Sequence, residues 1–179
     1  MNTVITYTLS FGTILSHIAI VFFVAVLAIR SSVADKFITW VGERAVLFSF
    51  LVVLTAVVGS LLYSNVIGFP PCELCIWQRI FLYPQLITFA LALWWREKNI
   101  LKYNIVLTLV GGIIALYHSF SQVTGLSVLP CTAEGAACSK LYVLAFGYIT
   151  IPVMALTTFL LLGMLYIFSR KTTRITSLM

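Results

Sequence analysis

The sequence predicts an all-α membrane protein, a polytopic bundle of five hydrophobic helices. Of its 179 residues, 61% are hydrophobic and only 9% are charged, and the mean hydropathy is +1.09. A soluble domain carries about a quarter charged residues. The charged residues also fall almost wholly between apolar runs. The runs are therefore predicted to lie in lipid, and the gaps between them to be loops.

Five apolar segments are long enough to cross a hydrocarbon core of about 30 Å, which takes roughly 20 helical residues. In chain order they are Leu9–Ile29, Ala45–Tyr63, Ile76–Trp95, Tyr103–Phe120 and Leu144–Phe168. The first resembles a cleaved signal peptide in length, but no basic residue precedes it, and Arg30 and Lys36 follow it. It is therefore interpreted as a span. No internal repeat is evident, so residues 1–179 are predicted to form a single integral membrane domain.

The distribution of Lys and Arg predicts the orientation of the spans, because these residues accumulate in short cytoplasmic loops. Nine of the eleven fall on one side of the five-span arrangement: Arg30, Lys36, Arg44, Arg96, Lys98, Lys102, Arg170, Lys171 and Arg174. Only Arg79 and Lys140 fall toward the other side. The prediction is a multi-pass protein of a bacterial cell membrane with its N-terminus outside and its C-terminus cytoplasmic. The cations form no basic face with interleaved aromatic residues, so nucleic-acid binding is not predicted.

All four cysteines lie in the two outer loops of this arrangement. Cys72 and Cys75 form a Cys-x-x-Cys pair just before the third span, and Cys131 and Cys138 lie in the second outer loop with six residues between them. Disulfides persist on the oxidising side of a membrane. Four outer cysteines therefore indicate either two structural disulfides or one redox relay.

The second pair fits an exchangeable disulfide better than a structural staple. Closing a loop as small as that between Cys131 and Cys138 stabilises a fold by only about 2–3 kcal/mol. The enclosed residues are small or polar and have no core to brace. This loop is interpreted as a docking site for a partner's thiols.

The first pair lies where a helix is predicted to begin. Pro70 and Pro71 end the preceding loop, so Cys72 and Cys75 would open the third span. Unpaired N–H groups and the macrodipole at a helix N-terminus stabilise negative charge and lower the pKa of a cysteine. The thiolate is the form that attacks a disulfide or an electron acceptor.

Two further residues are candidates for the same site. Arg79 follows Cys75 by four residues and is predicted to lie one turn deeper on the same helix face. An arginine at mid-bilayer costs about 2.5–3.5 kcal/mol, which favours a fixed cation beside an electron acceptor, with snorkelling toward the headgroups as the alternative. His118, near the outer end of the fourth span, can bind an acceptor oxygen or carry a proton, with interhelical packing as its alternative. His17, deeper in the first span, is interpreted as a packing residue.

At these positions the chain resembles the DsbB family of disulfide bond formation proteins, especially its short-loop branch. The similar motifs are Pro71-Cys72-Glu73-Leu74-Cys75, Gln78-Arg79, Tyr83-Pro84, Tyr117-His118 and Phe146-Gly147-Tyr148-Ile149-Thr150-Ile151-Pro152. The resemblance covers roughly residues 45–168 and implies a four-helix core. Residues 9–29 would then be an extra N-terminal membrane helix. The second outer loop is also shorter than in the best-known members.

The resemblance implies a membrane disulfide oxidoreductase that reoxidises an extracytoplasmic, DsbA-like thioredoxin-fold protein. Cys131 would form the mixed disulfide with that partner, and Cys138 would carry the exchange to Cys72 and Cys75. The latter pair would lie beside a membrane quinone, either ubiquinone or menaquinone. By the same resemblance Arg79 and His118 are the predicted quinone-binding residues.

Three other classes of protein compete with this interpretation. Proteins that resemble vitamin K epoxide reductase place the loop pair before the Cys-x-x-Cys pair, whereas the order here is reversed. A zinc or copper protein would use the four cysteines as thiolate ligands, but a Cys-x6-Cys spacing is unusual for zinc, so no metal site is predicted. A scaffold held by structural disulfides would keep its cysteine redox states unchanged in the presence of quinone and mild reductant.

Overall fold

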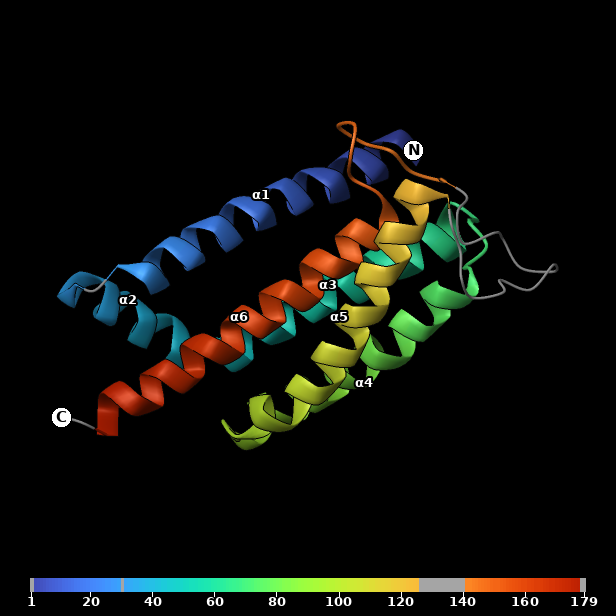
Figure 1. Ribbon diagram of the computed structural model, residues 1–179. Coiled ribbons are helices and arrows are strands. Elements are labelled where there is room, and N and C mark those ends of the chain that lie inside the picture. Colours follow the sequence, from blue (N-terminus) through green and yellow to red (C-terminus); the bar gives the residue numbers. More distant parts are fainter. Residues whose placement is uncertain (1, 30, 126–140, 178–179) are drawn as a thin grey trace.

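The chain folds into long helices (Figure 1). The computed structural model describes residues 2–29, 31–125 and 141–177. In chain order the elements are α1 (Asn2–Ala28), α2 (Ser32–Glu43), α3 (Ala45–Leu61), the π-helix η1 (Leu62–Val66), α4 (Glu73–Trp95), α5 (Ile100–Thr124) and α6 (Ile151–Ser177). Five are long and apolar enough to cross a membrane, with η1 continuing α3. The predicted fold class, an all-α multi-pass membrane protein, is confirmed.

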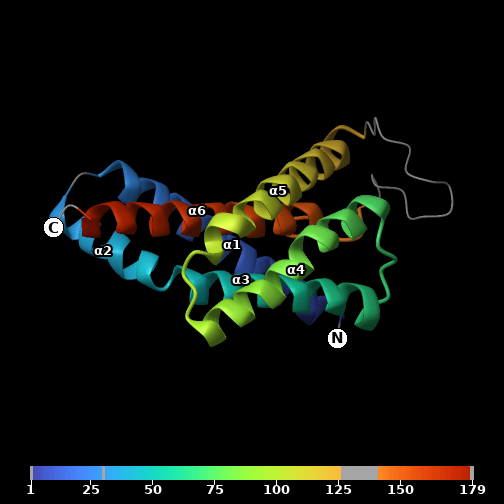
Figure 2. The same cartoon turned by 90° about the horizontal axis from the view of Figure 1, so that it is seen from below.

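Helices α3 to α6 pack in a ring, with α3 against α4, α4 against α5, α5 against α6, and α6 back against α3. The side chains of Val53, Phe89 and Ala115 belong to its hydrophobic core and are almost fully buried. Phe168 of α6, also fully buried, packs against Phe23 of α1 and Phe37 of α2. Helices in lipid associate through such close packing and through interhelical hydrogen bonds. The ring is the predicted four-helix core, and α1 lies along its outside, mainly against α6 (Figures 1 and 2).

The two ends of the bundle differ in charge. The N-terminus, the start of α4 and the loop before α6 lie at one end, and α2 and the C-terminus lie at the other (Figure 1). The second end also carries eight of the described cations: Lys36, Arg44, Arg96, Lys98, Lys102, Arg170, Lys171 and Arg174. The half-buried Arg79, by contrast, lies near the first end.

A short helix, α2, occupies a segment that was predicted to be a loop. The Ser31 hydroxyl caps it by accepting a hydrogen bond from the backbone N–H of Ala34 at 3.2 Å. Thr172 of α6 donates to the backbone carbonyl of Ile38 at 3.0 Å. A Cβ added at Gly42 would overlap Thr172, so glycine allows α2 and α6 to touch. With 12 residues, α2 is too short to span a bilayer, and the search for spans overlooked it.

The last span begins at Ile151, and the predicted start at Leu144 was wrong. Phe146 and Gly147 have backbone φ angles of 51° and 80°. This left-handed conformation cannot continue a right-handed helix. A non-glycine residue seldom adopts it, so an apolar run containing Phe146 gave no sign of the turn.

The segment between α3 and α4 is held by aromatic contacts. Residues Leu62–Val66 follow π-helical spacing, which is rare and often found at functional sites. The ring of Tyr63 stacks on that of Phe69 with centroids 6.0 Å apart, and Phe69 also packs on Tyr142 at 5.0 Å. Two prolines then lead directly to Cys72. These contacts fix the place where α4 begins.

Candidate functional site

Cys72 is the N-cap residue of α4, as its position after two prolines predicted. Its backbone is extended, with φ −73° and ψ 168°, and its sulfur accepts a hydrogen bond from the backbone N–H of Cys75 at 3.4 Å. An N-cap acceptor satisfies a backbone donor that has no partner within the helix. The sulfur therefore sits where the helix favours negative charge.

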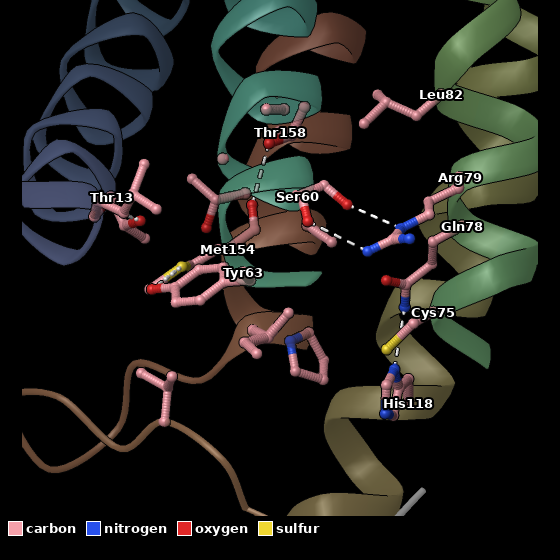
Figure 3. Close-up of a pocket in the computed structure, with 18 of the residues that line it drawn as sticks. Thr13, Ser60, Tyr63, Cys75, Gln78, Arg79, Leu82, His118, Met154 and Thr158 are labelled. Carbon is pink, nitrogen blue, oxygen red and sulfur yellow. Dashed lines mark hydrogen bonds between the residues drawn. The ribbon is translucent and has the colours of Figure 1, made fainter. Parts of the chain in front are cut away.

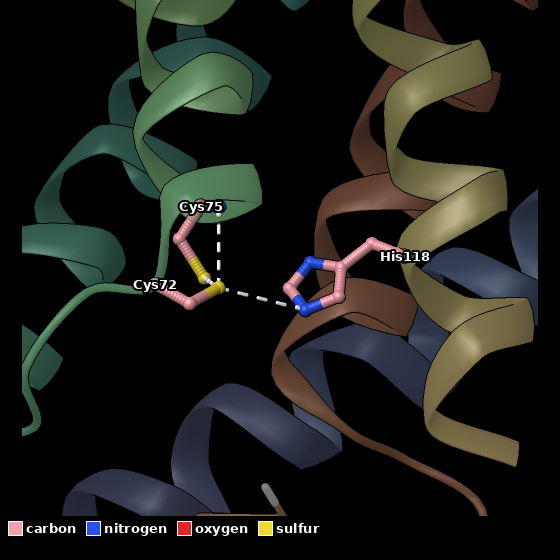
Figure 4. A group of neighbouring side chains, drawn as sticks. All are labelled: Cys72, Cys75 and His118. Carbon is pink, nitrogen blue, oxygen red and sulfur yellow. Dashed lines mark hydrogen bonds between the residues drawn. The ribbon is translucent and has the colours of Figure 1, made fainter. Parts of the chain in front are cut away.

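The two sulfur atoms of the Cys-x-x-Cys pair lie 2.8 Å apart, and both residues are free thiols (Figure 4). The hydrogen bond from the Cys75 thiol lowers the pKa of Cys72 to about 4. Burial of Cys72 opposes this effect, and the hydrogen bond and charge of His118 reinforce it, as does the Cys75 backbone N–H. Cys72 is consequently the thiolate of the pair at neutral pH.

His118 connects the cysteine pair to a second polar side chain. It projects from α5, is 1% exposed, and places Nε2 3.6 Å from the Cys72 sulfur. Its Nδ1 lies 3.2 Å from the side-chain amide of Gln78, on α4 (Figure 3). When Gln78 donates to Nδ1, the ring proton resides on Nε2, facing the sulfur. Gln78 thus orients His118 toward Cys72.

Arg79 is held by α3. Its Nε donates to the Ser60 hydroxyl at 2.8 Å, and its Nη2 donates to the Ser60 backbone carbonyl at 3.1 Å (Figure 3). Ser60 directly precedes the last residue of α3 and the π-helix that follows it. A guanidinium can serve two acceptors at once because its donors form a rigid fork. Arg79 is therefore fixed within the bundle, and snorkelling does not describe its position.

A cavity of about 410 Å³ connects these groups. It is lined by residues from all five long helices, including Cys72, Cys75, Arg79 and His118. Sites for small molecules commonly measure roughly 300–1,000 Å³ and combine apolar walls with a few placed polar groups. The lining here is mostly apolar, with the cation and the thiols toward the α4 side (Figure 3).

The structure brings together four of the six predicted site residues: Cys72, Cys75, Arg79 and His118. Cys131 and Cys138 lie outside the described residues. Their predicted roles stay predictions.

Two further residues of the site, Gln78 and Ser60, were assigned no role from the sequence. A signal existed for Gln78, because it follows Cys75 by three residues and shares its helix face. Ser60 gave no such signal, since serine is common where membrane helices pack closely. Trp77, which lies next to Gln78 in the sequence, does not line the cavity, and 47% of its surface is exposed.

The same residues also satisfy the geometry of a metal site. The ligand atoms of Cys72, Cys75 and His118 all lie within 4.8 Å of one another. Two thiols and an imidazole suit a soft or borderline ion such as Zn²⁺ or Cu⁺. Proximity alone therefore permits both metal binding and thiol exchange, and the prediction of no metal stays a prediction.

Comparison with known proteins identifies the family of the chain. The family model described as Disulfide bond formation protein DsbB matches residues 42–169. The chain belongs to the DsbB family. Disulfide bond formation protein C of Bacillus subtilis (strain 168) is 39% identical over 115 residues, which are 64% of this chain and 83% of that protein. The probable disulfide formation protein of Metapseudomonas resinovorans is 31% identical over 137 residues, 75% of this chain and 93% of that protein. No solved structure matches the chain significantly.

Membership of the DsbB family identifies a multi-pass membrane protein with a disulfide oxidoreductase role. The matched region contains α3 to α5, most of α6 and all four described site residues. It leaves α1 and most of α2 outside. The Cys-x-x-Cys pair therefore lies within the matched region, and α1 lies outside it.

Proposed function

We propose that this protein reoxidises a DsbA-like thioredoxin-fold protein outside the cytoplasm and passes the electrons to a membrane quinone, either ubiquinone or menaquinone. One observation carries the proposal. A Cys-x-x-Cys pair containing a stabilised thiolate lines the same cavity as Arg79, between membrane helices. A reductant, a cation and room for a small apolar molecule occur together there.

In the proposed path the partner's dithiol first reduces a disulfide between Cys131 and Cys138. A thiolate of the partner attacks Cys131 to form the mixed disulfide and releases Cys138, and Cys138 then attacks Cys72 in a Cys72–Cys75 disulfide and releases Cys75. The partner's second thiol displaces Cys131, and Cys131 displaces Cys72 from Cys138. The partner then leaves oxidised, and Cys72 and Cys75 are left as thiols. Tyr142, four residues after Cys138, packs on Phe69, three residues before Cys72. Four residues reach at most roughly 14 Å. This contact supports an exchange between the two pairs.

Closing the Cys72–Cys75 disulfide completes the path within the protein. The reaction turns two thiols into one disulfide and releases two electrons and two protons. Cys72 has already lost its proton as a thiolate, so the remaining one leaves the Cys75 sulfur. A bound quinone would supply the electron sink, taking up two electrons and two protons. His118, beside the Cys72 sulfur, is placed to stabilise the thiolate while the pair is in its reduced form.

The residues around the cavity fit a quinone. Arg79 and Ser60 offer polar hydrogen atoms for a ring oxygen, and a hydrogen bond to a charged group contributes about 1.5–3 kcal/mol. Leu82 and Met154 add apolar surface for the ring. The cavity also lies among the segments able to span a membrane, where a quinone dissolves.

The proposed orientation places Cys72 and the N-terminus outside and the C-terminus in the cytoplasm. Eight described cations at the opposite end from Cys72 support it, because Lys and Arg favour the cytoplasmic side. Reporters fused after Ser127 are expected to be exported, and reporters fused after Glu97 or Thr172 to stay inside. A cytoplasmic signal at Ser127 would contradict the whole path.

A reconstituted assay tests the proposal. The purified protein is mixed in lipid nanodiscs with a reduced thioredoxin-fold protein and a soluble quinone analogue, and partner disulfide and quinol are measured together. We expect equal amounts of both products. Cys75→Ser serves as the control, because it removes the pair while retaining a side chain of similar shape. Repeated turnover of the partner without quinone, beyond the amount that the protein's own disulfides oxidise, or no quinol formation at all, would contradict the proposal.

A trapping experiment tests the order of exchange. Cys138→Ala is incubated with the partner in its disulfide form, so that the Cys131 thiolate attacks and opens the partner's disulfide. Because the Cys138 thiol that would release the partner is missing, we expect a reducible complex in which the partner is joined to Cys131. Mass spectrometry of the cross-linked peptide identifies the cysteine. Finding the partner on Cys72 would show that the two pairs have the opposite roles.

The proximity of Cys72, Cys75 and His118 keeps metal binding as a second candidate function. Elemental analysis of the purified protein decides between the two. Stoichiometric zinc or copper, together with thiols that are alkylated only after chelation, would favour metal binding over electron transfer.

A further inference from the structure

The additional helix α1 forms one side of the cavity, although it lies outside the region shared with the family. Its residues Thr8, Leu9, Gly12, Thr13 and Ser16 line the cavity. In Figure 3, Thr13 faces the site from the side opposite Arg79, with the labelled residues of α3 and α6 between them. A helix that only added a membrane anchor would not need to face this space.

Polar contacts hold α1 in that position. His17 Nε2 lies 2.8 Å from the Thr157 hydroxyl of α6, and His17 Nδ1 lies 3.3 Å from the Tyr148 hydroxyl. Nearer the N-terminus, Leu9 packs against Gly59, where an added Cβ would approach the leucine to 3.2 Å. α1 is thus attached to both α6 and α3 beside the cavity.

The hydroxyls near α1 are directed at their own helices. Thr13 donates to the Leu9 carbonyl at 2.9 Å, and Ser16 donates to the Gly12 carbonyl at 2.8 Å. Across the cavity, Thr55 of α3 likewise donates to the backbone of its own helix. The hydroxyl groups of Thr13, Ser16 and Thr55 already donate their hydrogen atoms to backbone carbonyls, so these side chains present mainly carbon atoms to a ligand.

The α4 side of the cavity has the opposite character. There Arg79 bonds across to Ser60 of α3, and Gln78 contacts His118 of α5. The cavity therefore has a polar end beside the thiols and a less polar end beside α1. A quinone has the same division between an oxygen-bearing ring and a hydrocarbon tail.

We infer that α1 is the wall against which the hydrocarbon tail of the quinone lies. The inference rests on the proposed function, because it assumes that the ring is bound beside Arg79. Gly12 provides room for the tail: it lines the cavity, and no atom lies within 4 Å of a Cβ built there. A larger side chain at this position would occupy tail space without striking the protein.

The test compares Gly12→Leu with Gly163→Leu. Gly163 lies on α6, does not line the cavity, and also has no atom within 4 Å of an added Cβ, so it is a matched control. Equilibrium binding is measured for two quinone analogues with the same ring, one carrying a decyl tail and one without a tail. We expect Gly12→Leu to weaken binding of the decyl analogue roughly tenfold, or about 1.4 kcal/mol, which is within the cost of forcing extra methylenes into a filled space. The tail-less analogue, and both analogues in Gly163→Leu, should bind as in the wild type.

A second measurement does not depend on a variant. A quinone analogue with a photoreactive diazirine at the end of its tail is cross-linked to the wild-type protein, and labelled peptides are identified by mass spectrometry. We expect label within residues 8–16, lost when unlabelled decyl analogue is added. Label confined to α4 or α5, or equal weakening of both analogues by Gly12→Leu, would overturn the role of α1. Wild-type protein that binds neither analogue would contradict the proposed function as well.

Discussion

Helices α1 and α4 begin at the same end of the molecule and line the same cavity, yet they differ in how they are held (Figure 1). In the most apolar stretch of α1 only 6% of the residues are buried within the protein, so lipid is its main neighbour. In the corresponding stretch of α4 the share of buried residues is 28%. α1 carries no charged residue, while α4 carries Arg79. The two helices that form opposite walls of the cavity thus differ in burial and in charge.

The difference shows what each wall is able to do. Polar side chains of α4 are tied to neighbouring helices, so their positions are fixed relative to the thiols. Fixed charges and dipoles are what stabilise charge during a reaction. α1 supplies mainly apolar contact surface, whose effect on a ligand depends on its shape and not on fixed charges. Substitutions on α4 should therefore change rates, and those on α1 should change fit or stability.

Arg79→Gln should show the largest difference between the walls. Losing a charged hydrogen bond of about 1.5–3 kcal/mol should lower kcat/KM for the quinone analogue roughly ten- to a hundredfold. Arg79→Lys should recover part of the loss, because it keeps the charge but lacks the planar fork. Steady-state rates against quinone concentration give the effect, and single-turnover exchange with the partner is the control. Wild-type quinone kinetics in Arg79→Gln would remove the arginine from the site.

The second largest effect should be on the pKa of Cys72, which depends on the groups that contact its sulfur. Its lowered pKa means that the charged form persists as the pH falls and is lost only near pH 4. At pH 7 its thiolate fraction should be roughly thirtyfold that of a free cysteine with a pKa of about 8.5. The rate at which Cys72 is alkylated should therefore stay constant from pH 8 to pH 5, whereas that of a free cysteine falls with the pH.

A variant of His118 sharpens that experiment. His118 lowers the pKa of Cys72, so His118→Ala should move the loss of reactivity to higher pH. Iodoacetamide labelling of Cys72, followed by peptide mass spectrometry, measures the profile. His17→Ala on α1 is the control, and its profile should equal that of the wild type. An identical profile in His118→Ala would show that the imidazole does not stabilise the thiolate.

His17→Leu should produce the smallest effect and should act on stability alone. It removes the contacts to Thr157 and Tyr148, and interhelical hydrogen bonds in membranes average about 0.6 kcal/mol each. A decrease in stability of about 1 kcal/mol is expected, measured by thermal unfolding in detergent. Turnover of a tail-less quinone should not change. A loss of turnover with unaltered stability would mean that α1 takes part in the chemistry.

The sequence predicted the parts of the molecule that depend on composition and on helix periodicity. Five spans follow from apolar length, and the proximity of Arg79 to Cys75 follows from the four-residue spacing. His118 was a candidate from its position near the outer end of the fourth span and from the resemblance to the family, but neither placed it beside Cys72. That contact joins residues 46 positions apart and depends on how α4 and α5 pack.

Other features depend on backbone detail that residue type does not reveal. The hydrogen bonds between Arg79 and Ser60 require a particular rotation of α3 against α4. The late start of α6 depends on a left-handed Phe146, which no pattern of apolar residues predicts. The role of α1 as a cavity wall could not be foreseen either, because its small polar residues are interspersed among apolar ones and do not show which face meets protein.

The π-helix Leu62–Val66 has a consequence for the length of this part of the chain. A π-turn contains one residue more than an α-turn, so η1 accommodates the equivalent of a single-residue insertion in an otherwise regular helix. Deleting one residue there would restore α spacing and leave the direction of the following chain almost unchanged, because five residues at π spacing and four at α spacing both turn the chain by roughly 400°. The same deletion inside a regular stretch of α3 would instead rotate everything after it by about 100° around the helix axis. The π-helix thus absorbs one residue while Phe69 keeps its place between Tyr63 and Tyr142, just ahead of the thiols.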